Sequence, residues 1–242
     1  MNYAIKDAAD VTLFRKQEDG TKVPVLFTDY ANSTSLEFSS DRVYATAKGA
    51  NKVVFDSNKS GTFSLELQVF DTKWLSILLG AVEDESVKEY AKREVLTVAG
   101  GKVTLSETPK AGSIAMFTVE TDLRSHKAEV TDTTVAGADV TINAGATDGD
   151  KVVVYYLADT AAAVKSFKVT DSDYPEAYVI HGDAMLKNEL GTEEFVQLRI
   201  PNCRPQGNFN ISFSSSDIAT LTATFDILAD ESGDMCEFIY IQ

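Results

Sequence analysis

This 242-residue chain has little of what catalysis, metal binding or a disulfide framework requires. Its two cysteines, Cys203 and Cys236, are too few to cross-link a chain of this length, so we expect two reduced thiols, with a single disulfide as the alternative. The two histidines, His126 and His181, stand far apart and outside any recognisable catalytic or metal-binding motif. We therefore predict a protein with no enzymatic activity, no cofactor and no bound metal.

Positive charge and long apolar runs are also scarce. The chain has 22 Lys and Arg residues against 37 Asp and Glu residues, a net charge of −15. Such a surface repels phosphate, which excludes sequence-independent binding to DNA or to anionic membranes. The longest apolar stretch, residues 74–82, is about half the ~20 residues of a membrane span, and the first residues do not form a signal peptide. We expect a soluble protein that stays in the compartment where it is made.

Short strands with one apolar and one polar face dominate what the sequence does contain. Residues 62–69, 208–214 and 219–227 alternate with a period of two. This pattern predicts an antiparallel sheet that is packed on one side and solvated on the other. The polar faces carry mostly short hydroxyl and amide side chains, at Ser64, Glu66, Gln68, Asn210, Ser212, Thr220, Thr222 and Thr224.

One short helix is predicted among these strands. Asp71 is a candidate N-cap, Gly80 is placed to end the helix, and apolar residues including Trp74 cover most of its circumference. A helix of this kind should lie buried against the sheet. Residues 83–94, which are highly charged, are compatible with either a helix or a linker.

The middle of the chain contains an internal duplication. Thr97–Leu105 is echoed by Thr134–Ile142 at an offset of 37 residues, and Gly112 matches Gly149 in the same register. Each copy leads into an apolar strand, which predicts a small Ig-like sandwich built from duplicated hairpins. The predicted fold is mainly β: an antiparallel β-sandwich or half-barrel with one flanking α-helix, formed by residues 1–90 and 165–242 and interrupted by an inserted Ig-like module at 91–164.

Several segments together resemble the tail tube (major tail) proteins of long-tailed bacteriophages. The resemblance rests on the order and spacing of residues 24–38, 43–56, 58–67 and 71–80, the last being a helix that follows a strand, as in that family. Residues 190–242 match the family in character. Residues 95–158 depart from its minimal pattern and have the character of an inserted decoration.

The resemblance implies a structural virion protein that assembles with itself into hexameric rings stacked as a hollow tail tube. Each subunit is expected to give four strands to an inner barrel, and such a barrel closes at a backbone diameter of about 48 Å, which admits a DNA duplex. The polar faces named above would then line the lumen, and double-stranded DNA would pass without specific binding. Implied partners are the tape measure protein, the baseplate or initiator, the tail terminator and, in a contractile tail, a sheath protein. The expected location is the virion tail, after assembly in the host bacterial cytoplasm.

Two other classes of protein remain as alternatives. One is a different β-sandwich component of the virion, such as a baseplate or capsid-decoration protein. The other is a secreted carbohydrate-binding or adhesin sandwich, which the missing signal peptide and the buried helix disfavour. Rings or tubes in electron micrographs of the purified protein would distinguish the tube protein from both.

Overall fold

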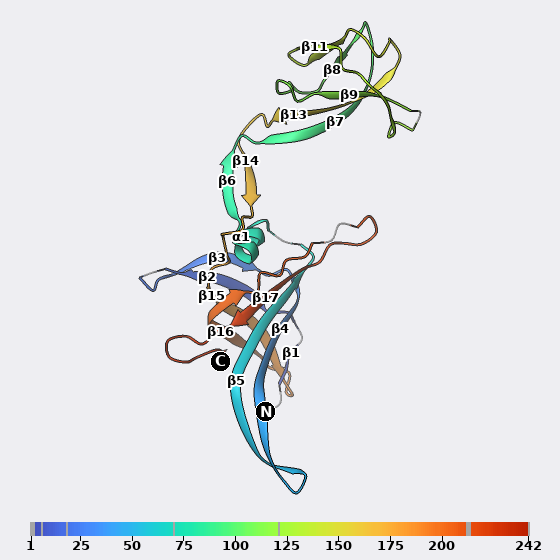
Figure 1. Cartoon of the computed structure of the whole chain (residues 1–242). Coiled ribbons are helices and arrows are strands. Elements are labelled where there is room, and N and C mark those ends of the chain that lie inside the picture. Colours follow the sequence, from blue (N-terminus) through green and yellow to red (C-terminus); the bar gives the residue numbers. More distant parts are fainter. Residues whose placement is uncertain are drawn as a thin grey trace. The chain divides into compact units, whose positions relative to one another are not determined.

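A computed structural model of the chain describes residues 3–5, 7–17, 19–69, 71–120, 122–211 and 214–241. The structure confirms the predicted fold class, because the described residues form antiparallel sheets with one short helix (Figure 1). The chain divides into two compact units. Unit 1 comprises Met1–Glu83 and Phe167–Gln242, and unit 2 comprises Asp84–Ser166.

Unit 1 is built on a nine-stranded sheet. Seven strands follow the order β3-β2-β15-β16-β17-β5-β4, while β1 pairs with β15 and β18 pairs with β16. The strands of this sheet are β1 (Tyr3–Ile5), β2 (Asp10–Lys16), β3 (Lys22–Thr28), β4 (Ala31–Ala47), β5 (Ala50–Leu67), β15 (Tyr178–Asn188), β16 (Glu193–Pro205), β17 (Leu221–Ile227) and β18 (Glu237–Ile241).

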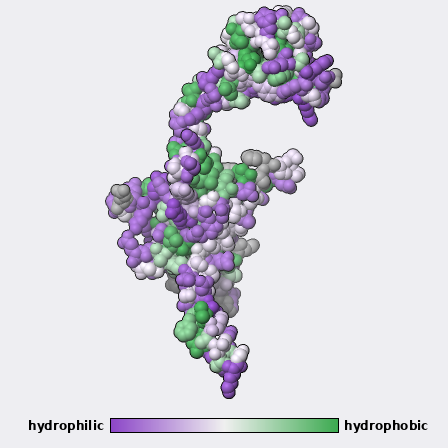
Figure 2. All heavy atoms as spheres, viewed as in Figure 1, coloured by the Kyte–Doolittle hydropathy of each residue, from purple (hydrophilic) through white to green (hydrophobic). Residues whose placement is uncertain are grey.

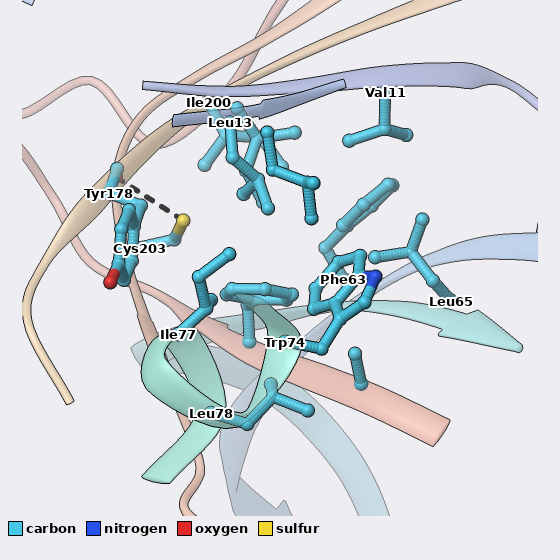
Figure 3. Close-up of a cluster of buried hydrophobic side chains, with 14 of the residues drawn as sticks. Val11, Leu13, Phe63, Leu65, Trp74, Ile77, Leu78, Tyr178, Ile200 and Cys203 are labelled. Carbon is cyan, nitrogen blue, oxygen red and sulfur yellow. Dashed lines mark hydrogen bonds between the residues drawn. The ribbon is translucent and has the colours of Figure 1, made fainter. Parts of the chain in front are cut away.

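Strand β16 connects the two halves of this sheet, which are β3-β2-β15 on one side and β17-β5-β4 on the other. Its residues 195–199 pair with β18 and its residues 203–205 pair with β17, so both partners lie along the same edge of β16. A register shift at the β15 partners Tyr178 and Ile180 marks the point between them. The apolar faces of both halves contribute to one core, which also includes Trp74, Ile77 and Leu78 of the helix (Figure 3).

The helix α1 (Lys73–Leu79) confirms the predicted segment and its burial. The side chain of Asp71 accepts a hydrogen bond from the backbone N–H of Lys73 at 2.8 Å, although Thr72 is the N-cap residue by position. Gly80 ends the helix in the left-handed conformation, with φ of 65°. Trp74 is fully buried, as expected of a core residue.

The β4–β5 hairpin extends beyond the core as an arm, defined here as residues 39–60. The two strands pair up to Ala47 and Ala50, and every residue of the arm is exposed. Its apolar side chains have exposed fractions of 46–63% at Val43, Tyr44, Val53, Val54 and Phe55. Figure 2 shows these hydrophobic residues on the arm, with hydrophilic residues at its tip.

Unit 2 has its own core between two smaller sheets. One sheet has the order β10-β9-β13-β7 and the other β11-β12-β8. Their strands are β7 (Glu89–Thr97), β8 (Lys102–Thr104), β9 (Ala115–Val119), β10 (His126–Glu129), β11 (Thr133–Ala136), β12 (Asp139–Ile142) and β13 (Lys151–Asp159). Strands β6 (Val82–Ser86) and β14 (Val164–Lys168) pair with each other and contain the two unit boundaries.

The bounds of unit 2 differ from the expected 91–164, since the compact unit spans 84–166. The helical alternative for residues 83–94 is wrong, because this segment belongs to β6 and β7. The strands that pair with β6 and β7 are β14 and β13, which lie far along the sequence. The local pattern of charged residues therefore did not reveal that this segment forms strands.

The duplicated segments occupy equivalent positions in unit 2. Strands β8 and β12, which correspond at the offset of 37 residues, pair directly, with Val103 opposite Val140. The following strands of the two copies, β9 and β13, also pair with each other. Each copy therefore contributes one strand to each of the two sheets of unit 2: β8 and β9 come from the first copy, and β12 and β13 from the second.

Candidate functional site

The polar faces of three neighbouring strands form one continuous surface, which we call the polar face. The register places Ser33 of β4, Glu66 of β5 and Thr222 of β17 in one row. The next two rows are Ser35–Ser64–Thr224 and Glu37–Thr62–Asp226. Two hydrogen bonds cross between strands, from Ser33 Oγ to Glu66 Oε2 at 3.1 Å and from Ser64 Oγ to Thr224 Oγ1 at 3.2 Å.

The opposite face of the same strands is part of the unit 1 core. Phe63 and Phe225 are paired in register there, as are Leu65 and Ala223, and all are buried. Side chains alternate between the two faces of a strand, so a one-residue slip would exchange the polar and buried sets. Burial of the apolar set therefore fixes which side chains face solvent on the polar face.

The structure brings together four of the eight predicted site residues on this face: Ser64, Glu66, Thr222 and Thr224. Gln68 and Thr220 are exposed and lie one residue beyond the paired Leu67 and Leu221, so they flank the same surface. Asn210 is exposed but lies outside the strands. Ser212 falls outside the described residues.

The predicted strand at 208–214 is wrong where it can be compared, because residues 206–211 are not part of any strand. Gly207 has φ of 70°, a left-handed conformation that turns the chain away from β16. The ladder between β16 and β17 ends at Pro205 and Phe225, with one further hydrogen bond from Gln206 N–H to the carbonyl oxygen of Thr224. Residues 208–211 do not continue this ladder along residues 221–223 of β17.

Sequence reasoning missed the contribution of β4 to the polar face. Ser33, Ser35 and Glu37 alternate with the more buried Thr34 and Leu36, which is the signal that could have identified them. Thr62 and Asp226, which share the alternation of the predicted residues, complete the third row.

The polar face is weakly acidic. Its nine positions include Glu37, Glu66 and Asp226 but neither lysine nor arginine. The nearest cation in register is Arg204 of β16, opposite Asp226, and its Nε donates to the carbonyl oxygen of Pro175 at 3.0 Å. Gln206 Nε2 donates to Asp226 Oδ1 at 2.7 Å. A surface of short hydroxyls and scattered carboxylates offers a polyanion weak contacts and mild repulsion.

Neither a metal centre nor a membrane-spanning helix is present in the described ranges. No group of three or more His, Cys, Asp or Glu residues is arranged there to hold a metal ion. No helix among those residues combines the length and the apolar composition that a membrane crossing requires. Cys203 and Cys236 are free thiols; Cys203 is buried and Cys236 is half-buried.

Comparison with known proteins agrees with this geometry. The chain is 26% identical to the tail tube protein of Bacillus phage SPR over 241 residues, which covers 97% of this chain and 87% of that protein. The sequence model of the YomU/Tube protein family matches residues 3–241, a range that includes both compact units. The chain therefore belongs to the YomU/Tube protein family.

Proposed function

We propose that this protein is the structural subunit of a phage tail tube and has no enzymatic activity. Its copies assemble into hexameric rings, and the stacked rings form the hollow tube through which DNA passes into the host. The similarity to a tail tube protein over nearly the whole chain supports this proposal. In this assembly the polar face lines the lumen, with Ser64, Glu66, Thr222 and Thr224 at its centre and Gln68 and Thr220 at its border.

The observation that carries the proposal is the composition of the polar face. Outward-facing strand surfaces of soluble proteins usually carry Lys and Glu in mixture. Here the nine positions carry six short hydroxyl side chains, three carboxylates and no cation. Each lysine or arginine that meets a DNA phosphate adds salt-dependent affinity, so a conduit that must release its cargo needs a surface without them.

Ring stacking is the proposed role of the arm. Its apolar residues are exposed in the single chain, and residues 43–55 include Lys48 and Lys52 but no acidic residue. The opposite end of the same strands, where Ala31, Leu67 and Leu221 are in register, is flanked by Asp29, Asp71 and Asp217. Figure 1 shows the two ends at opposite extremes of β4 and β5. Repetition of the subunit along these strands would bring the cationic end of one copy to the acidic end of the next.

Unit 2 is proposed to be an Ig-like decoration that the tube itself does not need. Both chain crossings into it lie in one strand pair, β6 and β14, and it has a separate core. Insertions of this kind are tolerated where the entry and exit points are close together on a surface. Other proposed partners are the tape measure protein, the baseplate or initiator, the tail terminator and, in a contractile tail, the sheath. The proposed location is the virion tail, after assembly in the host cytoplasm.

Replacing Thr222 and Thr224 with lysine tests the lumen assignment. Thr222 is exposed and Thr224 is half-buried on the polar face, and neither belongs to the core, so the double variant Thr222→Lys/Thr224→Lys should fold and assemble normally. Its tubes should pass DNA more slowly, and added salt should restore part of the rate because each new phosphate contact is screened. The double variant Thr222→Gln/Thr224→Gln, which adds length without charge, is the matched control and should pass DNA at the wild-type rate.

Chemical labelling of the two new lysines provides a second test of the lumen assignment. An amine reagent too large to enter the bore should leave the new lysines of assembled tubes unmodified and modify them in the dissociated subunit. Modification at the same rate in both states would place the polar face outside the tube. Electron micrographs that show only monomers of the wild-type chain under all conditions would favour the other virion roles instead.

A further inference from the structure

The β10-β9-β13-β7 sheet of unit 2 (Figure 1) has an outer face, opposite the unit 2 core, that carries a packed cluster of its own. Side chains alternate along β13, so Val152 and Val154 lie in the core while Val153 and Tyr155 lie on the outer face. Val153 is nevertheless fully buried. Its register partner on β9 is Phe117, and the larger side chains of this face therefore pack over it.

Three ring side chains form this outer cluster: Phe117 of β9, His126 of β10 and Tyr155 of β13. Phe117 and His126 are stacked, with ring centroids 4.4 Å apart and an interplanar angle of 7°. The ring of Tyr155 stands at 72° to Phe117 and at 67° to His126. The imidazole is the exposed member of the stack, because His126 is exposed and Phe117 is half-buried. The cluster therefore presents a flat ring to solvent with an upright ring beside it.

Arg93 of β7 is held next to these rings by hydrogen bonds. Its Nε donates to the hydroxyl of Tyr155, its register partner, at 3.3 Å, and its Nη2 donates to the carbonyl oxygen of Leu123 at 2.9 Å. The Tyr155 hydroxyl also lies 2.9 Å from His126 Nε2, so one oxygen links all three side chains. A guanidinium has five N–H groups and these bonds use two, which leaves donors on the exposed Arg93 side chain for a ligand.

Arg93 has no carboxylate partner among the residues that the structure describes, and the same holds there for Arg124. Four lysines of unit 2 do form ion pairs with Asp or Glu: Lys88, Lys92, Lys102 and Lys110. Arg124 directly follows Leu123, whose carbonyl oxygen accepts from Arg93, so the same loop carries a second cation. A positioned arginine without an acidic partner is suited to bind carboxylate or phosphate oxygens.

Glu129 of β10 adds a hydrogen-bond acceptor to the same face. It is exposed and is the register partner of Phe117, so the two side chains lie on one side of the sheet. An apolar ligand would leave Arg93 and Glu129 covered without partners. A sugar ring fits the combination, because it has apolar C–H groups that stack on a flat ring and hydroxyls that both donate and accept.

We propose that the outer face of unit 2 is a binding site for an acidic saccharide. The sugar ring stacks on the imidazole of His126 beside Tyr155, its carboxylate or phosphate group binds Arg93, and its hydroxyls donate to Glu129. All of these residues belong to unit 2, so the site is separate from the polar face of unit 1 and adds a binding function to the proposed tube subunit.

Calorimetric titration of the unassembled full-length chain tests this proposal. The probes are trigalacturonic acid for a carboxylate, glucose 6-phosphate for a phosphate, neutral maltotriose, and inorganic phosphate without a sugar ring. At least one acidic sugar should bind, and which one does identifies the anionic group. Maltotriose and inorganic phosphate should each bind about tenfold or more weakly, because each lacks one half of the recognised chemistry.

Variants assign the binding to these residues. Arg93→Gln and His126→Ala should each weaken binding of the acidic sugar about tenfold or more, whereas His126→Phe keeps a flat ring and should retain most of the affinity. The matched control Lys102→Gln removes one positive charge from the other sheet of unit 2 and should bind like the wild type. Thermal unfolding of each variant shows that unit 2 keeps its fold.

Four results would overturn the proposal. Absence of binding by both acidic sugars at millimolar concentration would exclude the site. Maltotriose that binds as tightly as the acidic sugars would exclude the role of charge, and inorganic phosphate that binds as tightly would reduce the site to an adventitious anion contact. Unchanged affinity in folded Arg93→Gln and His126→Ala would place the ligand elsewhere. Each of these results leaves the proposed tube assembly untouched, because the titration uses single chains.

Discussion

The two separate cores predict that the two units unfold independently. Leu65 is fully buried in the unit 1 core, and Met116 is 1% exposed in the unit 2 core. Replacing a buried leucine or methionine with alanine costs about 2–5 kcal/mol, because apolar contact is lost and a cavity remains. We expect Leu65→Ala to destabilise unit 1 alone and Met116→Ala to destabilise unit 2 alone.

The size of each unit determines how far a given loss of stability lowers its Tm. Unit 1 has roughly 160 residues, a size at which 1 kcal/mol shifts the Tm by about 2–4 °C, so a loss of about 3 kcal/mol lowers its Tm by about 6–12 °C. Unit 2 has roughly 80 residues, and the same loss lowers its Tm by about 12–24 °C. Calorimetry of the unassembled chain should show two transitions, each moved by one substitution, with additive shifts in the double variant.

A single transition moved by both substitutions would refute this reasoning, because it would mean that the units unfold as one cooperative structure. Replacement of residues 87–163 by a short Gly/Ser linker provides an independent check. This deletion retains the whole of β6 and of β14 and removes all strands of the two unit 2 sheets. Unit 1 should then unfold at its original temperature.

Three further predictions concern single residues. Burial, and to a smaller extent the positive charges of Arg199 and Lys22, lowers the pKa of His181 below its ordinary value near 6.5. The unfolded chain therefore binds more protons than the folded one around this pH. The Tm of unit 1 should therefore fall as the pH is lowered through about 6.5, and His181→Gln should flatten this dependence; an unchanged slope would contradict the assignment. Burial raises the pKa of the Cys203 thiol, so alkylation followed by mass spectrometry should modify Cys203 only after unfolding. Gly80→Ala should lower unit 1 stability by about 1–3 kcal/mol in denaturant titration, because φ is 65° and the new Cβ would lie 2.7 Å from a backbone carbon; a neutral effect would show that the helix end can relax.

The local alternation of the sequence was enough to predict the two faces of β5 and β17. In residues 62–67 and 221–227 every second side chain is apolar, and all of these apolar side chains lie in the core as expected. The helix was equally accessible, since Gly80 and the apolar run from Trp74 are local signals. The same alternation failed at 208–211, because Gly207, with φ of 70°, turns the chain and the β16–β17 ladder does not continue past Gln206.

The sequence by itself therefore determined which side chains of each strand face the core and which face water. Its excess of acidic residues also determined the negative net charge that repels phosphate. These properties depend on neighbours two residues apart and on the sum of charges. Only the tertiary structure decided which strands are adjacent. Ser64 and Thr224 are 160 positions apart, yet their hydroxyls are hydrogen-bonded. The contribution of β4 to the polar face follows from the same long-range pairing, which no local pattern encodes because it depends on where entire strands meet in space.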